Sequence, residues 1–403
     1  MEKLITYDDP LSTITGYHDI SLITSRDCTL RCTYCYLHKH PDNFYDMDKI
    51  LAGADTLLKY YHDQDNSDKE EEGIIFNFYP EPWVNVERTN TLVLEALKLL
   101  HKYPRFHGKY MVSVGTNGLH LDRPVPIFES LNNQGRLSLS VTVDGIKEQH
   151  DLYRVTPNGK GSWDTIVKNV RMLKDRYEIR GTKVTIGPDT VKYIYDSVLY
   201  LWNDLGLDSI NINVVFENLW GTKEEKEKTL EDFDNQLSRL YDYIVENRLW
   251  EKGKYVSFLG ERRVPMQKFE NLVYKKEMVS SIEEFKNNPY CGAAVMRSVD
   301  TDGEIYPCFR LSPYSLNAES PYNINKNNFV EGPMRALHAI NSYDGASYEC
   351  LNCELLSTCH MCFGGSWEEK QSVYHRTMHH CEFHKTEHKW ALKLKKYINN
   401  IKV

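Results

Sequence analysis

Short apolar runs alternate with helical patterns from the start of the chain to about residue 216. This alternation is typical of repeated βα units, in which strands pair in parallel and helices cover the sheet. The apolar runs predict six strands, at residues 20–24, 74–78, 110–114, 137–143, 183–186 and 209–216. We therefore expect an α/β fold in which six βα units form an open or partial barrel. Its chemistry should lie at the C-terminal ends of the strands.

Apolar residues at helical spacing predict the helices. One face gathers Ile50, Ala54, Leu57, Leu58 and Tyr61, and a second gathers Val191, Ile194, Val198, Leu201 and Leu205. Another helix should begin after Ser162, a suitable N-cap. A longer helix over about 223–250 should bridge to a second domain, and a basic amphipathic helix over 384–402 should pack on that domain. The mostly charged run 63–72 predicts a solvated loop.

The bulk composition limits the kind of protein. A chain of 403 residues is too long for one ordinary core unless that core is a barrel. The formal charge of −8 argues against a nucleic-acid binder, which needs a basic surface. No stretch of about 18 apolar residues and no signal-peptide pattern occurs. We therefore expect a cytoplasmic protein that binds neither nucleic acid nor a membrane.

The ten cysteines fall into two groups, three near the N-terminus and seven between residues 291 and 381. In a secreted chain they could form five disulfides, but close spacing in a chain without a signal peptide favours metal or redox chemistry. Together with the strand pattern they predict four segments. These are a barrel at 1–216, a bridging helical region at 217–290, a cysteine-rich domain at 291–383 and a C-terminal helix at 384–403.

The first group, Cys28, Cys32 and Cys35, follows directly after the first predicted strand. Three thiolates within eight residues suit one corner of an iron–sulfur cubane and leave its fourth iron without a protein ligand. An open metal position is where substrate chemistry takes place. The spacing, with Tyr34 before the last cysteine, resembles the signature of radical S-adenosylmethionine (SAM) enzymes. The alternative is a zinc site or a chance spacing.

The resemblance implies a 4Fe-4S cluster whose open iron binds SAM. An electron from a partner such as flavodoxin or ferredoxin would cleave SAM to methionine and a 5′-deoxyadenosyl radical. The residues that resemble the family's SAM contacts are Tyr34, Glu81, Thr116, Asn117, Asp144 and Arg154. Relatives usually have Gly-Gly before the Glu-Pro pair, whereas this chain has Tyr79 and Pro80, so carbonyls alone are expected to hold the SAM amino group there. The plain alternatives are a turn at Asn117 and a surface ion pair between Asp151 and Arg154.

The second group consists of Cys291, Cys308, Cys350, Cys353, Cys359, Cys362 and Cys381. Taken alone, the block 350–362 is also compatible with a four-thiolate zinc knuckle. The whole pattern resembles the SPASM domain of some radical SAM enzymes, with an opening hairpin over 291–308, and implies two auxiliary 4Fe-4S clusters. By that resemblance Cys350, Cys353, Cys359 and Cys381 hold an outer cluster, and Cys291, Cys308 and Cys362 hold an inner one. Because the inner set lacks a fourth thiolate, we expect an open iron there or a ligand such as Asp300, Asp302 or Glu304.

SPASM enzymes mostly modify peptides or proteins, and their auxiliary clusters can accept the electron that a new bond or carbonyl releases. In the branch that oxidises Cys or Ser of sulfatases, an Asp base follows the cysteine that corresponds to Cys308, whereas this chain has Phe309 and Arg310. The surrounding sequence resembles instead the maturases of ribosomally made peptides. We therefore expect an oxidoreductase that forms a thioether or carbon–carbon cross-link in a peptide. Its catalytic base is not assigned.

Other functions stay open. The same chemistry could oxidise a protein side chain, as in sulfatase maturation, or act on a non-peptide small molecule. In a different class, the chain could be an iron–sulfur protein that transfers electrons or acts as a sensor without cleaving SAM. Only 27 residues precede Cys28, too few for the winged-helix domain with which many maturases grip a leader peptide. Leader recognition should then be absent or carried out by a separate protein.

Overall fold

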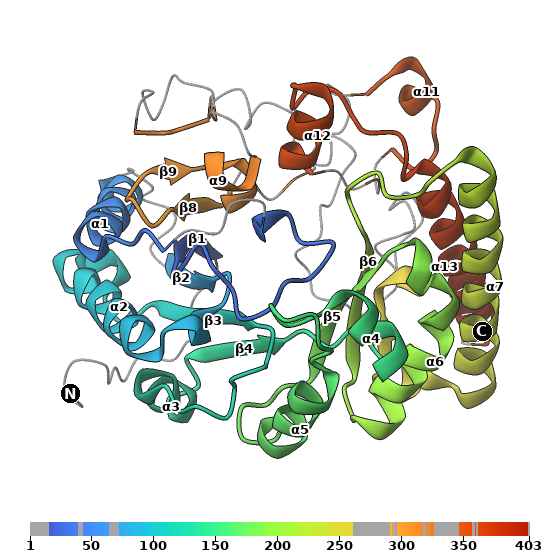
Figure 1. The fold of residues 1–403 in the computed structure, drawn as a ribbon, viewed down its shortest axis with the longest axis horizontal. Coiled ribbons are helices and arrows are strands. Elements are labelled where there is room, and N and C mark those ends of the chain that lie inside the picture. Colours follow the sequence, from blue (N-terminus) through green and yellow to red (C-terminus); the bar gives the residue numbers. More distant parts are fainter. Residues whose placement is uncertain are drawn as a thin grey trace. The chain divides into compact units, whose positions relative to one another are not determined.

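The computed structural model describes residues 16–38, 43–63, 72–260, 291, 293, 296–316, 320, 322–325, 346–356, 359 and 362–401. The chain divides into two compact units, each built from segments that lie far apart in the sequence. The first takes Met1–Thr142, Arg154–Ile179 and Gly292–Arg335, and the second takes Val143–Tyr153, Arg180–Cys291 and Ala336–Val403. Figure 1 labels the elements of both units.

The first unit holds a mostly parallel sheet. Its strands are β1 (Gly16–Ile23), β2 (Glu72–Tyr79), β3 (Tyr110–Thr116), β4 (Leu137–Val141), β8 (Arg297–Val299) and β9 (Ile305–Tyr306), in the order β4-β3-β2-β1-β8-β9. β1 pairs in parallel with both β2 and β8, whereas β8 and β9 form an antiparallel hairpin. In Figure 1 the orange hairpin lies beside blue β1. A segment from far along the chain thus extends the sheet at β1.

Helices bury the apolar side chains of this sheet. They are α1 (Met47–Asp63), α2 (Val86–Leu99), α3 (Pro126–Asn133), α5 (Trp163–Leu173) and the short α9 (Pro313–Leu316). Alternate residues of β3, among them Tyr110, Val112 and Val114, are buried, as the period of a strand requires. This packing fixes the ends of β1, β2 and β3, and with them the loops that follow these strands.

The second unit contains the parallel strands β5 (Gly181–Ile186), β6 (Ser209–Val214) and β7 (Tyr255–Val256). Its helices are α4 (Lys147–Tyr153), α6 (Ile194–Leu199), α7 (Lys223–Asn247), α11 (Tyr348–Leu351), α12 (Phe363–Lys370) and α13 (Cys381–Ile401). α13 packs along α7: the Trp390 indole donates a hydrogen bond to Asp234 (2.7 Å), and its ring lies 5.5 Å from that of Tyr241. The second unit therefore contains both the long helix α7 and the C-terminal helix α13, packed against each other.

All six predicted strands are present, with ends that shift by a few residues. Both predicted helical faces are buried, and the long helix predicted from residue 223 is α7. β7, β8 and β9 were not predicted, because two or three residues are too few to show a strand period. Residues 64–71 of the charged run lie outside the described residues. The partial barrel and the SPASM domain stay predictions.

Two local expectations are corrected. The C-terminal helix packs on α7 in the predicted bridging region, because its apolar residues, such as Phe383 and Trp390, meet those of α7. Ser162 precedes α5 as expected, but its hydroxyl donates to the Arg154 carbonyl (2.7 Å) and does not cap the helix. Within the described ranges, no helix is long and apolar enough to cross a bilayer.

Candidate functional site

The first three cysteines lie on a compact loop after β1. Cys32 is buried, Cys28 and Cys35 are half-buried, and the Cys35 amide donates to the Cys32 carbonyl (2.9 Å). Arg31 folds back over the loop, where it pairs with Asp27 (2.8 Å) and donates to the Cys28 carbonyl (2.5 Å). We call residues 24–35 the cysteine loop. Its shape is set by its own backbone and by Arg31.

The segment after α4 holds the cysteine loop from one side. The Arg31 amide donates to the Val155 carbonyl (2.7 Å), and the Arg154 guanidinium donates to the Tyr34 hydroxyl (2.7 Å). Tyr34 and Arg154 were both predicted as SAM contacts. The structure brings these two residues together within the first unit.

The end of β2 is joined to the end of β3 through Glu81. Its buried carboxylate accepts hydrogen bonds from the Asn117 amide (2.7 Å), the Thr116 hydroxyl (2.8 Å) and the Trp83 amide (3.2 Å). Burial raises the pKa of Glu81 to about 7, although these hydrogen bonds and the Arg154 charge act in the opposite direction. The Glu81 side chain therefore serves the structure of the turn after β3.

Asn117 connects that turn to the cysteine loop. Its side-chain amide donates to the Thr29 hydroxyl (2.8 Å) and to the Cys28 sulfur (3.4 Å). Burial raises the pKa of Cys28 to about 12, and the nearby Glu81 charge adds to this effect. The Cys28 thiol therefore stays protonated without a metal, and the Asn117 N–H that points at its sulfur would stabilise the negative charge of a metal-bound thiolate. The residues at this end of the sheet therefore fit a metal cluster.

No three His, Cys, Asp or Glu side chains among the described residues converge on the position of one metal ion.

Aromatic rings lie beside the cysteine loop. The Phe309 ring stacks on Tyr36, which follows Cys35, at 6.2 Å between ring centres, and lies 5.6 Å from the Tyr79 ring. A Cβ at Gly115 would come within 3.0 Å of the Tyr79 ring, so the glycine makes room for it. The two departures noted in the sequence, Tyr79 for glycine and Phe309 for aspartate, therefore pack against each other.

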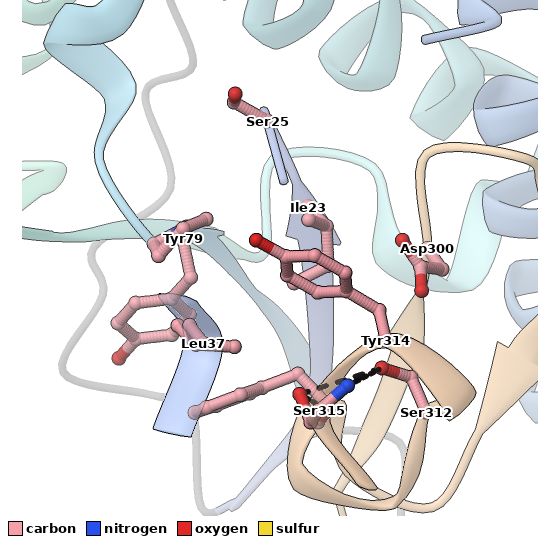
Figure 2. Close-up of a pocket in the computed structure, with 10 residues that line it drawn as sticks. Ile23, Ser25, Leu37, Tyr79, Asp300, Ser312, Tyr314 and Ser315 are labelled. Carbon is pink, nitrogen blue, oxygen red and sulfur yellow. Dashed lines mark hydrogen bonds between the residues drawn. The ribbon is translucent and has the colours of Figure 1, made fainter. Parts of the chain in front are cut away.

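A small pocket lies between the cysteine loop and the hairpin segment. It is lined by Ile23, Ser25, Leu37, Tyr79, Pro80, Asp300, Phe309, Ser312, Tyr314 and Ser315. Figure 2 shows Tyr314 reaching from α9 toward the end of β1, where its hydroxyl donates to the Arg26 carbonyl. The space inside is about 10 Å³, roughly what one water molecule needs. In this form the pocket is too small for a peptide side chain.

The carboxylates considered as a fourth ligand of the inner cluster have other partners. Arg26 binds both Asp300 (3.0 Å) and Asp302 (2.8 Å), and Asn323 donates to Glu304 (2.5 Å). The two Arg26 ion pairs tie the β8–β9 hairpin to the residues just before Cys28. Ligation by one of these carboxylates stays a prediction, and it would require its present contact to break.

In the second unit, Asp144 is buried and accepts from the Thr185 amide (3.0 Å), while its own amide donates to His150 (3.2 Å). Asp151 pairs with Lys147 (3.0 Å). Burial lowers the pKa of Lys183 on β5 even though the side chain is partly open to solvent, and the charges of Asp144 and Cys362 act in the opposite direction. Lys183 thus lies close to two predicted site residues.

Four later cysteines lie close together in the second unit. Burial raises the pKa of Cys359 to about 11; the nearby Arg376 lowers it, and Cys381, Cys350 and Cys353 raise it further. The Met378 sulfur lies 3.8 Å from the Cys350 sulfur and 4.0 Å from that of Cys381. These are the four residues predicted to hold the outer cluster.

Two of the three remaining cysteines stand at the starts of short elements. The Cys362 sulfur accepts from the Gly365 amide (3.4 Å) and so caps α12. Cys308 directly precedes the turn Phe309–Leu311, and Cys291 is half-buried.

Sequence reasoning missed Arg26, Lys183 and the packing role of Tyr79. The available signal for Lys183 was a charged residue within a predicted strand. The Arg26 pairs join residues more than 270 positions apart, and no local pattern could indicate them.

Comparison with known proteins points to one superfamily. Residues 22–201 match the family model described as the Radical SAM superfamily. The match begins in β1 and includes the cysteine loop, Glu81, Asn117 and Arg154.

Curated relatives cover most of the chain. A cysteine-type anaerobic sulfatase-maturating enzyme of Clostridium novyi is 24% identical over 302 residues, which are 72% of this chain and 74% of that enzyme. The radical SAM cyclopropyl synthase TigE of Paramaledivibacter caminithermalis is 20% identical over 381 residues, 91% of this chain and 72% of that enzyme.

Solved structures share the fold. Native anSMEcpe with bound AdoMet and Cp18Cys peptide has a TM-score of 0.66 at 20% identity, over 96% of this chain and 99% of that one. Streptococcus suis SuiB has a TM-score of 0.51 at 14% identity, over 91% of this chain and 77% of that one. At these identities the likeness concerns the fold alone.

Proposed function

We propose that the chain is a radical SAM enzyme that abstracts hydrogen from a peptide substrate, because residues 22–201 match the family model described as the Radical SAM superfamily. The observation that carries the proposal is the cysteine loop, where the Cys28 sulfur accepts a hydrogen bond from Asn117, which Glu81 holds at the end of β3. Sulfatase maturases and a cyclopropyl synthase among the relatives support a peptide or protein as the substrate.

The family implies a 4Fe-4S cluster and SAM, and the cysteine loop fits such a cluster. Cys28, Cys32 and Cys35 would hold three of its irons and leave the fourth for SAM. When bound and reduced by a partner such as flavodoxin or ferredoxin, this cofactor pair supplies a 5′-deoxyadenosyl radical. The chain's own residues have the task of holding the loop, SAM and substrate in place.

The residues predicted as SAM contacts receive two different roles in this proposal. Glu81, Thr116 and Asn117 hydrogen-bond to one another and to the cysteine loop, so they position the site. Tyr34 and Arg154 form a hydrogen-bonded pair next to Cys35, and a guanidinium suits the SAM carboxylate. We propose this pair as the direct contact.

We further propose that Cys350, Cys353, Cys359 and Cys381 hold an auxiliary cluster. Their mutual effect on the pKa of Cys359 supports the grouping. Removing hydrogen from a substrate leaves a radical, and a closed-shell product requires the loss of one more electron. An auxiliary cluster could accept that electron.

Two reactions on a peptide are candidates. Cross-linking removes two hydrogen atoms and joins the two atoms that carried them, whereas oxidation of a Cys side chain to an aldehyde consumes water and releases sulfide. Phe309, which stands where the sulfatase branch has its Asp base, stacks on Tyr36 and supports cross-linking. The sulfatase-maturating relatives favour oxidation as the second candidate.

A SAM-cleavage assay tests the first part of the proposal. Anaerobically reconstituted protein, reduced with dithionite and given SAM, should release 5′-deoxyadenosine. If SAM stays intact, the chain is an electron-transfer or sensor protein. A cysteine-containing peptide then separates the two reactions, because cross-linking keeps the sulfur in the product and oxidation releases it.

A further inference from the structure

The side chain of Asn117 is oriented by its neighbours. The Leu119 amide, which can only donate, lies 2.8 Å from Oδ1 of Asn117 and so identifies the oxygen end of the side chain. The nitrogen end therefore faces the cysteine loop, with Thr29 Oγ1 at 2.8 Å and Cys28 Sγ at 3.4 Å. An amide nitrogen carries two hydrogens, so both are used. Every polar group of this side chain has a partner.

The turn that carries Asn117 is held by two side chains, Glu81 and Asn169. The Glu81 carboxylate binds its backbone amide (2.7 Å), and Asn169 from α5 donates to the carbonyls of Gly118 (3.0 Å) and Leu119 (3.1 Å). Gly118 has φ +83°, and a Cβ there would come within 2.7 Å of Val141. The side-chain amide of Asn117 therefore points at the Cys28 sulfur before any cofactor binds.

We propose that Asn117 is a positioning residue that holds the Cys28 sulfur and raises the reduction potential of the cluster on the cysteine loop. The proposal rests on the cluster assignment under "Proposed function". An N–H group that points at a ligating sulfur stabilises negative charge on it, and the reduced cluster carries one more electron than the oxidised one. The hydrogen bond therefore favours the reduced form. In buried surroundings the effect is larger than it would be in water.

Two variants remove the donor in different ways. Asn117→Leu keeps the size of the side chain and removes both polar ends, whereas Asn117→Asp keeps the acceptor for Leu119 and cannot donate to sulfur. Asn169→Ala is the matched control, because it removes two hydrogen bonds to the same turn and has no contact with the cysteine loop. The reduction potential of each reconstituted protein is measured by a redox titration that is followed by electron paramagnetic resonance. The signal that changes when SAM is added identifies the cluster on the loop.

We expect the potential to become more negative in both Asn117 variants, and more so in Asn117→Asp, whose carboxylate adds a negative charge beside the cluster, than in Asn117→Leu, with Asn169→Ala equal to the parent protein. A tenfold decrease in the ratio of reduced to oxidised cluster, the size expected for Asn117→Leu, corresponds to about 59 mV for a one-electron couple. Unchanged potentials in both Asn117 variants would overturn the proposal. An equal shift in Asn169→Ala would also overturn it, because the effect would then come from the turn as a whole.

Iron content and circular dichroism are measured on the same samples. If Asn117→Leu folds but loses its iron while Asn169→Ala keeps it, the role of Asn117 in holding the Cys28 sulfur is supported. The effect on the reduction potential is then measured on Asn117→Asp. If the parent protein has no signal that responds to SAM, the proposed function is contradicted. The iron content of the Asn117 variants then tests whether Asn117 holds the Cys28 sulfur.

Discussion

The two groups of cysteines are supported in different ways. The cysteine loop of the first unit receives hydrogen bonds from Asn117 and Arg154 and is joined to the β8–β9 hairpin through Arg26. In the second unit, Cys350 and Cys353 lie at a helix of only four residues, α11, where Ser347 provides the cap and Met378 a sulfur contact. The comparison teaches that the fold itself orders the first group, whereas the second group should depend more on its metal.

Removing one thiol from each group should have the largest effect, and it tests whether the two groups bind iron independently. Cys32→Ala should abolish 5′-deoxyadenosine release and leave the iron of the later cysteines in place. Cys353→Ala should keep measurable SAM cleavage, because its cysteine lies in the other unit. Iron content and 5′-deoxyadenosine are measured for both variants. Loss of all iron in either variant would show that the groups are not independent.

Removal of iron should change the local dynamics of the two cysteine groups to different extents. After chelation under reducing conditions, amide hydrogen exchange should increase strongly over residues 346–356 and little over 24–35. The hydrogen bonds that hold the cysteine loop come from Asn117 and Arg154 and do not require iron, whereas α11 has only four residues and is capped by its own neighbour Ser347. Hydrogen exchange read by mass spectrometry checks this. An equal increase in both segments would remove the distinction.

The support of the first group should also depend on pH. Because burial raises the pKa of Glu81 from 4.5 to about 7, the folded state favours its neutral form. This contribution to stability is complete below about pH 4 and is lost as the pH rises through 7, on the order of 3 kcal/mol in total. Glu81→Gln cannot ionise, so its free energy of unfolding should fall less between pH 5 and 8. Urea unfolding at several pH values measures both proteins, and identical slopes would contradict the role of Glu81.

A smaller change tests how tightly the turn after β3 is packed. Gly118→Ala and Gly135→Ala both place an alanine at positive φ, which costs about 1–2 kcal/mol. Only Gly118 has neighbours in the way, Val141 at 2.7 Å and Ile166 at 3.1 Å, whereas the space around Gly135 is open. Crowding should add about 1–3 kcal/mol to the loss of stability in Gly118→Ala. If urea unfolding shows the same loss of unfolding free energy in both variants, the turn can rearrange to accommodate the added methyl group.

The sequence predicted the regular parts of the fold because their signals are local. Each of the six strands has an apolar run, and the cysteine spacing identified the loop that the family match includes. The contacts that shape the site are not local. Asn117 meets Cys28 across 89 positions, and Arg26 meets Asp300 across 274.

The motif departures carried information that could be interpreted only in three dimensions. Tyr79 and Phe309 each break the pattern of relatives, and the sequence gives no reason to connect them. In the structure their rings lie 5.6 Å apart, and Gly115 leaves the space that Tyr79 fills. A pair of substitutions that looked independent is one packing unit.

The pairing of β8 with β1 has a consequence for any shortened form of this protein. Ile20, Ser21 and Leu22 pair with Arg297, Ser298 and Val299, so the outer edge of β1 is covered by a strand from the last third of the chain. A fragment that ends at residue 216 would expose this edge, with its unpaired amides and carbonyls beside apolar side chains. Such an edge invites pairing with other molecules and aggregation. The N-terminal segment therefore needs the later hairpin to remain monodisperse, even before any cofactor is considered.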